Sequence, residues 1–312
     1  MSFALTKGTP VNLKSALIVV LVCIAYLVAS YFLVGFKTDQ LVLTGIFCTA
    51  YFLSSITRKF ILGFSIFIVY WIIFDYMKAF PNYNYNPVSI ANLYHAEKYL
   101  FGLNAGTMVL TPNEYWWLHH VSFLDVITGI FYLCWIPVPL AFAGYLFFTN
   151  RHQFLRFSLT FVTVNLLGFV VYYVYPAAPP WYVHFNGFQF HAGTPGNTAG
   201  LARFDAFFKI NVFKSIYAKG SNVFAAMPSL HSSYPVIVLY YGLKNRLGII
   251  NIFFATVMVG IWFAAVYTSH HYMLDVLAGI VCAIMGIVIF NLISTRYKPL
   301  RNALYKYEAV IQ

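Results

Sequence analysis

Long uncharged runs of apolar residues constrain this chain more than any other feature of its sequence. Several of them extend over roughly 15 to 25 residues, the length at which one helix crosses the hydrocarbon layer of a bilayer. A helix forms all its backbone hydrogen bonds internally, which is required in that layer because water is absent there. With 61% hydrophobic and only 9% charged residues, the composition is far from that of a soluble domain. The sequence therefore predicts an all-α polytopic membrane protein.

The apolar runs predict about eight transmembrane helices in a single membrane domain, residues 1–312. We expect these helices over residues 15–36, 41–56, 60–76, 121–148, 154–175, 230–243, 247–267 and 271–293. Two long segments, 77–120 and 176–229, are too polar to span, and their aromatic residues favour the membrane interface. The domain then comprises an N-terminal part (1–120), a helical core (121–293) and a basic tail (294–312).

The placement of Lys and Arg predicts the orientation in the membrane. An even number of helices puts both termini on one side, and most of the 19 Lys and Arg residues fall on that side. Positive flanks stay in the cytoplasm, so we expect cytoplasmic termini and long segments that face the periplasm or the lumen. A bacterial inner membrane is the expected location. The net charge of +11 follows from these flanking residues and does not indicate nucleic-acid binding.

Two motifs each end a polar segment and open an apolar one: Phe224-Ala-Ala-Met-Pro-Ser-Leu-His231 and Ser269-His-His-Tyr-Met-Leu-Asp275. In the first motif, Pro228 and Ser229 suit the start of a helix, which puts His231 in its first turn. Free backbone N–H groups and the positive end of the helix dipole meet there. The position therefore suits a phosphate.

In the second motif, His271 and Asp275 are four residues apart and are expected to share one helix face. A carboxylate on one ring nitrogen fixes the tautomer and makes the other nitrogen a better nucleophile. His-x-x-x-Asp alone is common and indicates only an interfacial pair. Here both histidines open apolar helices on the same side, and Asp275 lies in a membrane segment, where a carboxylate is costly. The two motifs predict one site at the level of the lipid headgroups.

The order Pro-Ser-x-His and then His-x-x-x-Asp resembles motifs two and three of the type-2 phosphatidic acid phosphatase superfamily. Three longer stretches look like its inositol phosphorylceramide synthase branch: Tyr175-Pro-Ala-Ala-Pro-Pro-Trp-Tyr182, Met227-Pro-Ser-Leu-His-Ser232 and Thr268-Ser-His-His-Tyr-Met-Leu-Asp275. The likeness extends from about Asn165 to Gly279, and the first four helices match only in general character.

The chain departs from the phosphatases at two cationic positions. They carry a first motif with Lys and then Arg-Pro, and this sequence contains no Arg-Pro. They also carry an Arg six residues before the motif-three His, where this chain has Ala265. Such cations help to hold a dianionic phosphate monoester, whereas a phosphodiester lipid carries a single charge and needs fewer of them. Both departures favour a phosphodiester donor.

The resemblance implies a transfer reaction that uses no metal and no cofactor. In it His271, oriented by Asp275, attacks the phosphorus of a phosphoinositide-type donor, and His231 protonates the diacylglycerol leaving oxygen. The phosphorylated histidine then passes the headgroup to a ceramide-like acceptor. The implied partners are these membrane lipids. The sequence leaves open the headgroup (inositol, choline or ethanolamine), the acceptor (ceramide or diacylglycerol) and the oligomeric state.

Several further residues are candidates for substrate binding. Positive charge could come from Lys214, Lys219 or Arg203, together with the helix start at Ser229. Trp181 and Tyr182 either line the headgroup pocket or anchor the chain at the interface. Asp125 either orients an acceptor hydroxyl or is a carboxylate satisfied by its neighbours.

Two other classes of function stay open at this stage. A metal-independent phosphatase of phosphatidate or polyprenyl phosphate is argued against by the missing cations. A non-catalytic membrane transporter or scaffold is argued against by the set of two histidines and one aspartate.

Overall fold

The computed structural model describes residues 11–218 and 222–312, which are helical almost throughout. Within these described residues, six helical stretches are long and apolar enough to cross a membrane. They are α1 (Leu13–Val34), α3 (Ser55–Tyr76) with η1 (Met77–Ala79), α6 (Ser122–Leu133) with α7 (Pro137–Thr149), α8 (Arg151–Val174), α13 (Ile250–Tyr267) and α14 (Met273–Arg296). The prediction of a polytopic membrane protein is confirmed. A short hairpin of β1 (Leu103–Ala105) and β2 (Met108–Leu110) corrects the all-α expectation.

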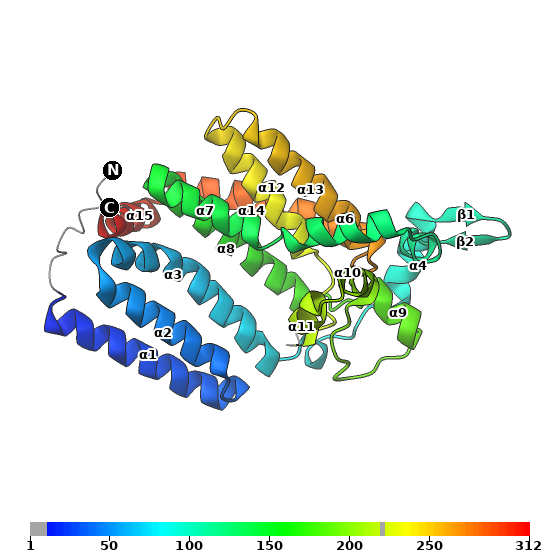
Figure 1. Ribbon diagram of the computed structural model, residues 1–312, viewed down its shortest axis with the longest axis horizontal. Coiled ribbons are helices and arrows are strands. Elements are labelled where there is room, and N and C mark those ends of the chain that lie inside the picture. Colours follow the sequence, from blue (N-terminus) through cyan, green and yellow to red (C-terminus); the bar gives the residue numbers. More distant parts are fainter. Residues whose placement is uncertain (1–10, 219–221) are drawn as a thin grey trace.

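The long helices lie in layers. Along one edge, α1, α2 (Thr38–Leu53) and α3 lie side by side (Figure 1). α3 packs against α8, and α8 packs against α7 and α14. On the other side, α12 (Leu230–Lys244) contacts α8, α13 and α14. Buried aromatic side chains such as Phe157 and Tyr234 fill these contacts. Packing on three sides fixes the start of α12 relative to the start of α14.

Three predicted boundaries differ from the structure, each for a local reason. The helix expected over 121–148 is broken into α6 and α7, because Pro137 at the start of α7 has no N–H to continue the ladder. The break expected at Arg58 falls instead at Ser54, whose side chain accepts the N–H of Thr57 and caps α3. The last span begins at Met273, so His271 lies in the turn before the helix.

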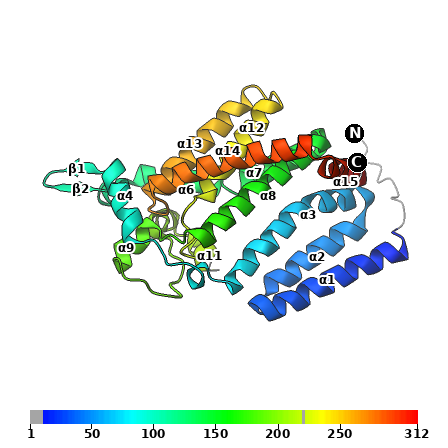
Figure 2. The same ribbon diagram turned by 180° about the vertical axis from the view of Figure 1, so that it is seen from behind.

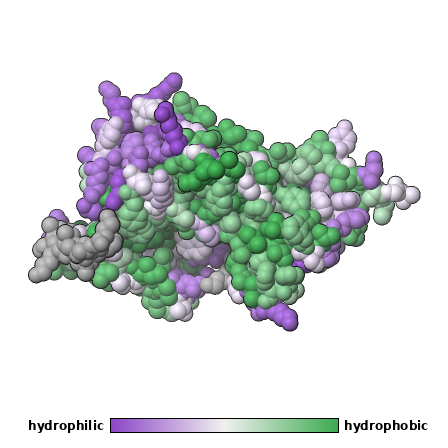
Figure 3. Space-filling model, turned by 45° about the horizontal axis from the view of Figure 1, so that its top comes forward, coloured by the Kyte–Doolittle hydropathy of each residue, from purple (hydrophilic) through white to green (hydrophobic). Residues whose placement is uncertain are grey.

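The two long segments gather at one end of the molecule, opposite α15 and the start of α1 (Figures 1 and 2). Their short elements are η2 (Asn82–Asn84), α4 (Ala91–Phe101), the hairpin, α5 (Pro112–Leu118), α9 (Pro180–Asn186), η3 (Ala199–Leu201), α10 (Ala202–Phe208) and α11 (Val212–Ala218). Apolar side chains cover much of the body of the molecule in Figure 3, and a large group of hydrophilic side chains lies toward the end opposite the two long segments.

The predicted basic tail is an ordered helix, α15 (Lys298–Ile311), which packs against α3, α8 and α14. The hydroxyl of Tyr307 donates to the carbonyl of Leu62 on α3. The Nδ1 of His152 on α8 lies 3.0 Å from a carboxylate oxygen of Glu308. The tail therefore closes the end of the bundle that lies opposite the two long segments.

Candidate active site

Two histidine rings face each other where α12 and α14 begin. The Nδ1 of His231 lies 3.1 Å from the Nε2 of His271. His231 lies in the first turn of α12, and His271 lies in the turn between α13 and α14. His271 is buried, whereas His231 is half-buried. The structure thus brings the histidines of both motifs into one site.

A backbone carbonyl sets the tautomer of His271. Its Nδ1 lies 3.0 Å from the carbonyl oxygen of Ala226, which can only accept, so Nδ1 carries the proton. The lone pair on Nε2 then points toward His231. Asp275 was expected to orient this ring, but its Oδ2 lies 3.7 Å from Nδ1 and accepts the backbone N–H of Tyr272. Ala226 is therefore the hydrogen-bond partner, and the carboxyl group of Asp275 lies beside it.

The proline-rich motif supports the carbonyl of Ala226. α8 ends at Val174, and the chain continues without helical structure past Pro176. The N–H of Ala177 donates to the carbonyl of Phe224 at 2.9 Å, and the N–H of Ala226 donates to the carbonyl of Ala177 at 3.3 Å. The motif that resembles the synthase branch therefore pairs with the segment that orients His271.

The starts of α12 and α14 differ in charge. Ser229 is the N-cap residue of α12, as predicted, but its hydroxyl caps no helix N–H and instead accepts the hydroxyl of Ser232 at 3.0 Å. The first turn of α12 carries no acidic residue. At α14, oxygens of Asp275 and Glu97 accept the first backbone N–H groups. The positive end of α12 is therefore the one that suits a phosphate.

Two residues outside the motifs hold the turn that carries His271. The Nδ2 of Asn113 donates to the carbonyls of Val266 and His271, at 2.8 and 2.9 Å. The fully buried Glu97 binds the start of α14. Sequence analysis missed both, because neither has a local motif and Asn113 contacts a partner 153 positions away. They give the segment 77–120 a structural role at the site.

Trp181 and Tyr182 are buried, which contradicts the idea that they anchor the chain at the interface. The backbone N–H of Trp181 donates to the carbonyl of Ser269 at 3.0 Å. The hydroxyl of Tyr182 donates to the carbonyl of Gln189 and accepts the N–H of His191. Both residues therefore brace the segment 176–229, with Trp181 attached directly to the turn of the second motif.

Asp125 and Arg203 form an ion pair at the end of the molecule where the two long segments gather. The Nε of Arg203 donates to the Oδ1 of Asp125 at 2.6 Å, and the hydroxyl of Tyr267 donates to the same oxygen at 2.9 Å. The Nδ1 of His120 lies 3.3 Å from Oδ2. Asp125 is thus the satisfied carboxylate of the two alternatives. Arg203 retains a buried Nη2 that has no hydrogen-bond partner among the described residues.

The other cationic candidates from the sequence are Lys214 and Lys219. Lys214 is exposed on α11, and its backbone N–H donates to Asp205 at 2.9 Å. Lys219 lies outside the described residues. Ala265, which stands where the phosphatases carry Arg, is fully buried, and its carbonyl accepts the N–H groups of His270 and His271. That position therefore contributes backbone geometry and no charge.

Aromatic rings enclose the histidine pair. The hydroxyl of Tyr132 lies 3.4 Å from the Nδ1 of His231, and Trp135 packs edge-on against the same ring. Tyr132 follows Asp125 by seven residues on one buried face of α6, a periodicity that could have revealed it in the sequence. Burial lowers the pKa of His271 to about 4, so this ring is neutral at neutral pH. Its Nε2 keeps a lone pair for attack.

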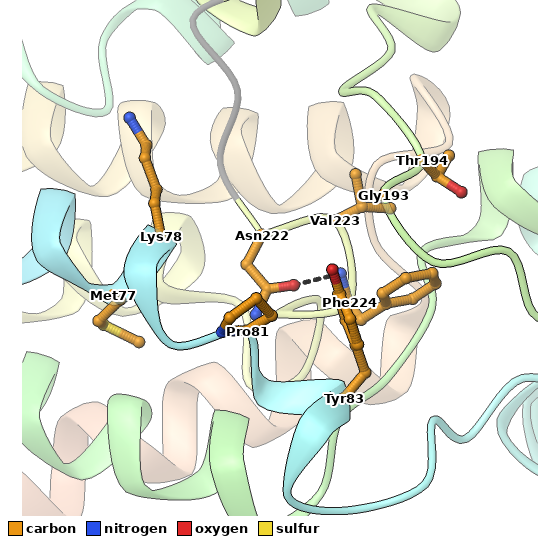
Figure 4. A pocket seen from close by; sticks show the side chains of 9 residues that line it. All are labelled: Met77, Lys78, Pro81, Tyr83, Gly193, Thr194, Asn222, Val223 and Phe224. Carbon is orange, nitrogen blue, oxygen red and sulfur yellow. Dashed lines mark hydrogen bonds between the residues drawn. The ribbon is translucent and has the colours of Figure 1, made fainter. Parts of the chain in front are cut away.

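A pocket of about 160 Å³ lies near the C-terminal end of α3 (Figure 4). It is lined by Met77, Lys78, Pro81, Tyr83, Gly193, Thr194, Asn222, Val223 and Phe224. The side chain of Asn222 accepts the N–H of Phe224 at 3.2 Å. The pocket therefore borders the segment that supports Ala226, and its lining does not include either motif histidine. Within 11–218 and 222–312, no three His, Cys, Asp or Glu side chains are grouped as metal ligands.

Comparison with known proteins assigns the class. Residues 104–289 match the PAP2 superfamily, and because this is more than half of the chain, the protein belongs to that superfamily. The match begins well before the region in which the sequence motifs show the resemblance.

The relatives are synthases. The chain is 41% identical over 302 residues to the phosphoinositol dihydroceramide synthase of Bacteroides thetaiotaomicron, which covers 96% of this chain and 99% of the relative. It is 28% identical over 230 residues to the inositol phosphorylceramide synthase catalytic subunit of Saccharomyces cerevisiae, covering 71% of this chain and 53% of the relative. No solved structure gives a significant match. The predicted family and branch are confirmed.

Proposed function

We propose that this protein moves phosphoinositol from a phosphatidylinositol-type donor to a ceramide-class acceptor and releases diacylglycerol. The observation that carries this function is the histidine pair, 3.1 Å apart, at a helix start that bears no carboxylate in its first turn. The full-length likeness to a phosphoinositol dihydroceramide synthase supports the choice of headgroup and acceptor. A phosphatase would need cations for a dianion, and Ala265 supplies none.

In the first half-reaction, the Nε2 of His271 attacks phosphorus and the bond from phosphorus to the diacylglycerol oxygen breaks. His231 enters this step as the imidazolium ion, gives a proton to that oxygen and becomes neutral, so diacylglycerol leaves as the neutral alcohol. The phosphorylated ring of His271 keeps its Nδ1 proton and gains positive charge. The carbonyl of Ala226 and the carboxylate of Asp275, 3.0 and 3.7 Å from Nδ1, stabilise that charge.

Attack in line with the leaving group requires the two histidines to separate. The entering nitrogen and the leaving oxygen lie on opposite sides of phosphorus, so phosphorus must come between His271 and His231. His271 is fixed by Ala226 through Nδ1, and its backbone is fixed by Asn113. His231 is half-buried, and its polar contact with the hydroxyl of Tyr132 is long, at 3.4 Å. We therefore assign the movement to the side chain of His231.

In the second half-reaction, His231 takes the proton of the acceptor hydroxyl, whose oxygen attacks phosphorus and displaces His271. The start of α12 at Ser229 and the free Nη2 of Arg203 hold the phosphate or the inositol during both steps. Lys214 and Lys219 remain candidates for long-range attraction of the donor. The reaction returns both histidines to their starting protonation states.

The same proposal includes the topology. The shorter helices α2 and α12, with 16 and 15 residues, complete eight spans beside the six long ones. Both termini are then cytoplasmic, and the site faces the periplasm or the lumen. α12 extends only about 22 Å, less than a hydrocarbon layer of about 30 Å. With its C-terminal end at the cytoplasmic boundary, α12 therefore begins just below the opposite boundary, where a site can reach the phosphates of lipids in that leaflet. Reporter fusions at Gln312 and within 77–120 should report opposite sides.

Lipid mass spectrometry of the purified protein tests the function. Phosphatidylinositol alone should release diacylglycerol slowly, and added ceramide should accelerate this release and yield inositol phosphorylceramide in equal amount. Phosphatidic acid should be a poor substrate. Fast release of inorganic phosphate from phosphatidic acid without any acceptor would instead establish a phosphatase.

A further inference from the structure

Glu97 lies where the segment 77–120 meets the catalytic turn. Its side chain is fully buried, and it belongs to α4, which packs against α14. Its Oε1 accepts the N–H of Met273 at 2.9 Å, and its Oε2 accepts the N–H of Leu274 at 3.1 Å. A carboxylate with both oxygens used in this way fixes two consecutive peptide units.

The peptides that Glu97 fixes lie between His271, in the turn before α14, and Asp275, in the first turn of α14. Met273 follows His271 by two residues, and the intervening N–H of Tyr272 is bound by Asp275. The two carboxylates therefore divide the first free N–H groups of α14 between them. If Glu97 released the N–H groups of Met273 and Leu274, these groups would attract the carboxylate of Asp275 and draw it away from the Nδ1 of His271.

We propose that Glu97 is a positioning residue for the transfer reaction, whose ionised carboxylate holds the start of α14 so that Asp275 stays beside His271. This inference rests on the proposed function of His271. A protonated carboxyl has one acceptor oxygen fewer for a backbone N–H, because its hydroxyl donates. Turnover should consequently depend on the ionisation of Glu97.

The surroundings of Glu97 place this ionisation near neutral pH. Burial raises the pKa of Glu97 to about 7, the two N–H groups act in the opposite direction, and the charge of Asp275 raises it further. The other ionisable groups close by are Tyr272 at the start of α14, Tyr94 and Lys98 on α4, and Glu114 on α5. Since the ionised form is the active one, turnover should rise as the pH passes through about 7.

The test compares pH profiles of the full-length protein in vesicles, with phosphatidylinositol and ceramide. We expect kcat of the unaltered protein to fall below pH 7. Glu97→Gln should lower kcat at pH 8 by about 10-fold to 100-fold, leave KM within about twofold, and remove the limb near pH 7. Relative to Glu97→Gln, Glu97→Asp should restore part of kcat and also restore a dependence of kcat on pH. Glu114→Gln, a nearby carboxylate that contacts Tyr94 and Thr111, should keep the original profile.

A Glu97→Gln profile that retains the limb near pH 7 would overturn the proposal. Amide hydrogen exchange of Met273 and Leu274 in the unaltered protein gives a second readout that needs no variant. Corrected for intrinsic rates, exchange should accelerate as the pH falls through 7, and constant protection would also refute the role of Glu97. Failure of the proposed function would appear differently, as absence of inositol phosphorylceramide at every pH.

Discussion

The starts of α12 and α14 lie together at the site, yet the chain treats their backbone N–H groups in opposite ways. α14 receives two carboxylates, Asp275 from its own first turn and Glu97 from α4. α12 has none in its first turn, and Ser229 does not use its hydroxyl as a cap. A helix start neutralised by carboxylates repels a phosphate, whereas an unneutralised one attracts it. The difference assigns α14 to holding the nucleophile and α12 to binding the substrate.

The largest effect should come from removing the reacting groups on either helix start. His271→Ala and His231→Ala should each lower the transfer rate at least about 10³-fold, because one forms the phosphorus bond and the other moves the proton. Asp275→Asn should be nearly as severe, since an amide cannot balance the charge that forms on His271. Transfer rates of folded variants, checked by thermal unfolding, measure this. Near-normal turnover of any one of them would refute its assigned role.

Placing a carboxylate on α12 should erase the difference between the two helix starts. Ser229→Asp should lower kcat/KM about tenfold, because its charge opposes the donor phosphate at the dipole. Ser229→Asn has the same size without the charge and controls for the tight packing of Ser229 against Gly279. The ratio of the two variants measures the electrostatic part. Equal kcat/KM values would show that the start of α12 does not contact the phosphate.

Arg203 tests whether a side chain adds to the charge of α12. Arg203→Ala should raise KM for the lipid donor about tenfold. The buried Nη2 of Arg203 has no hydrogen-bond partner among the described residues, so it can donate a hydrogen bond to the lipid phosphate. Arg203→Lys should restore little of this affinity, since the single ammonium group of Lys cannot replace the planar guanidinium in binding Asp125 and the substrate together. An unchanged KM in Arg203→Ala, with retained folding, would limit Arg203 to its pair with Asp125.

Lys214 should give the smallest effect. Its side chain is exposed on α11, so solvent screens its attraction for the donor. Lys214→Ala should change kcat/KM by less than about twofold at physiological salt. Measurement at low and high ionic strength checks this screening, and a large salt-independent loss would place Lys214 in direct contact with the phosphate.

The sequence predicted His231, His271 and Asp275 because each lies in a short motif with a fixed local geometry. It also predicted the membrane class, since apolar runs determine it directly. The position of His271 before the helix was not predicted, because Met273 starts α14 through a contact with Glu97, 176 positions away. The break between α6 and α7 at Pro137 interrupts what the sequence predicted as one helix over 121–148. Residues that act through long-range backbone contacts, such as Ala226 and Asn113, leave no local pattern.

Direct detection of the phosphorylated histidine is the most direct test of the account. The purified protein is incubated with phosphatidylinositol alone, quenched in base and digested, and the peptide that contains His271 is analysed by mass spectrometry. We predict an inositol-phosphate adduct on His271 that accumulates with release of one equivalent of diacylglycerol and disappears when ceramide is added. An adduct on His231, or rapid synthesis of inositol phosphorylceramide with no adduct on any histidine, would contradict transfer through His271.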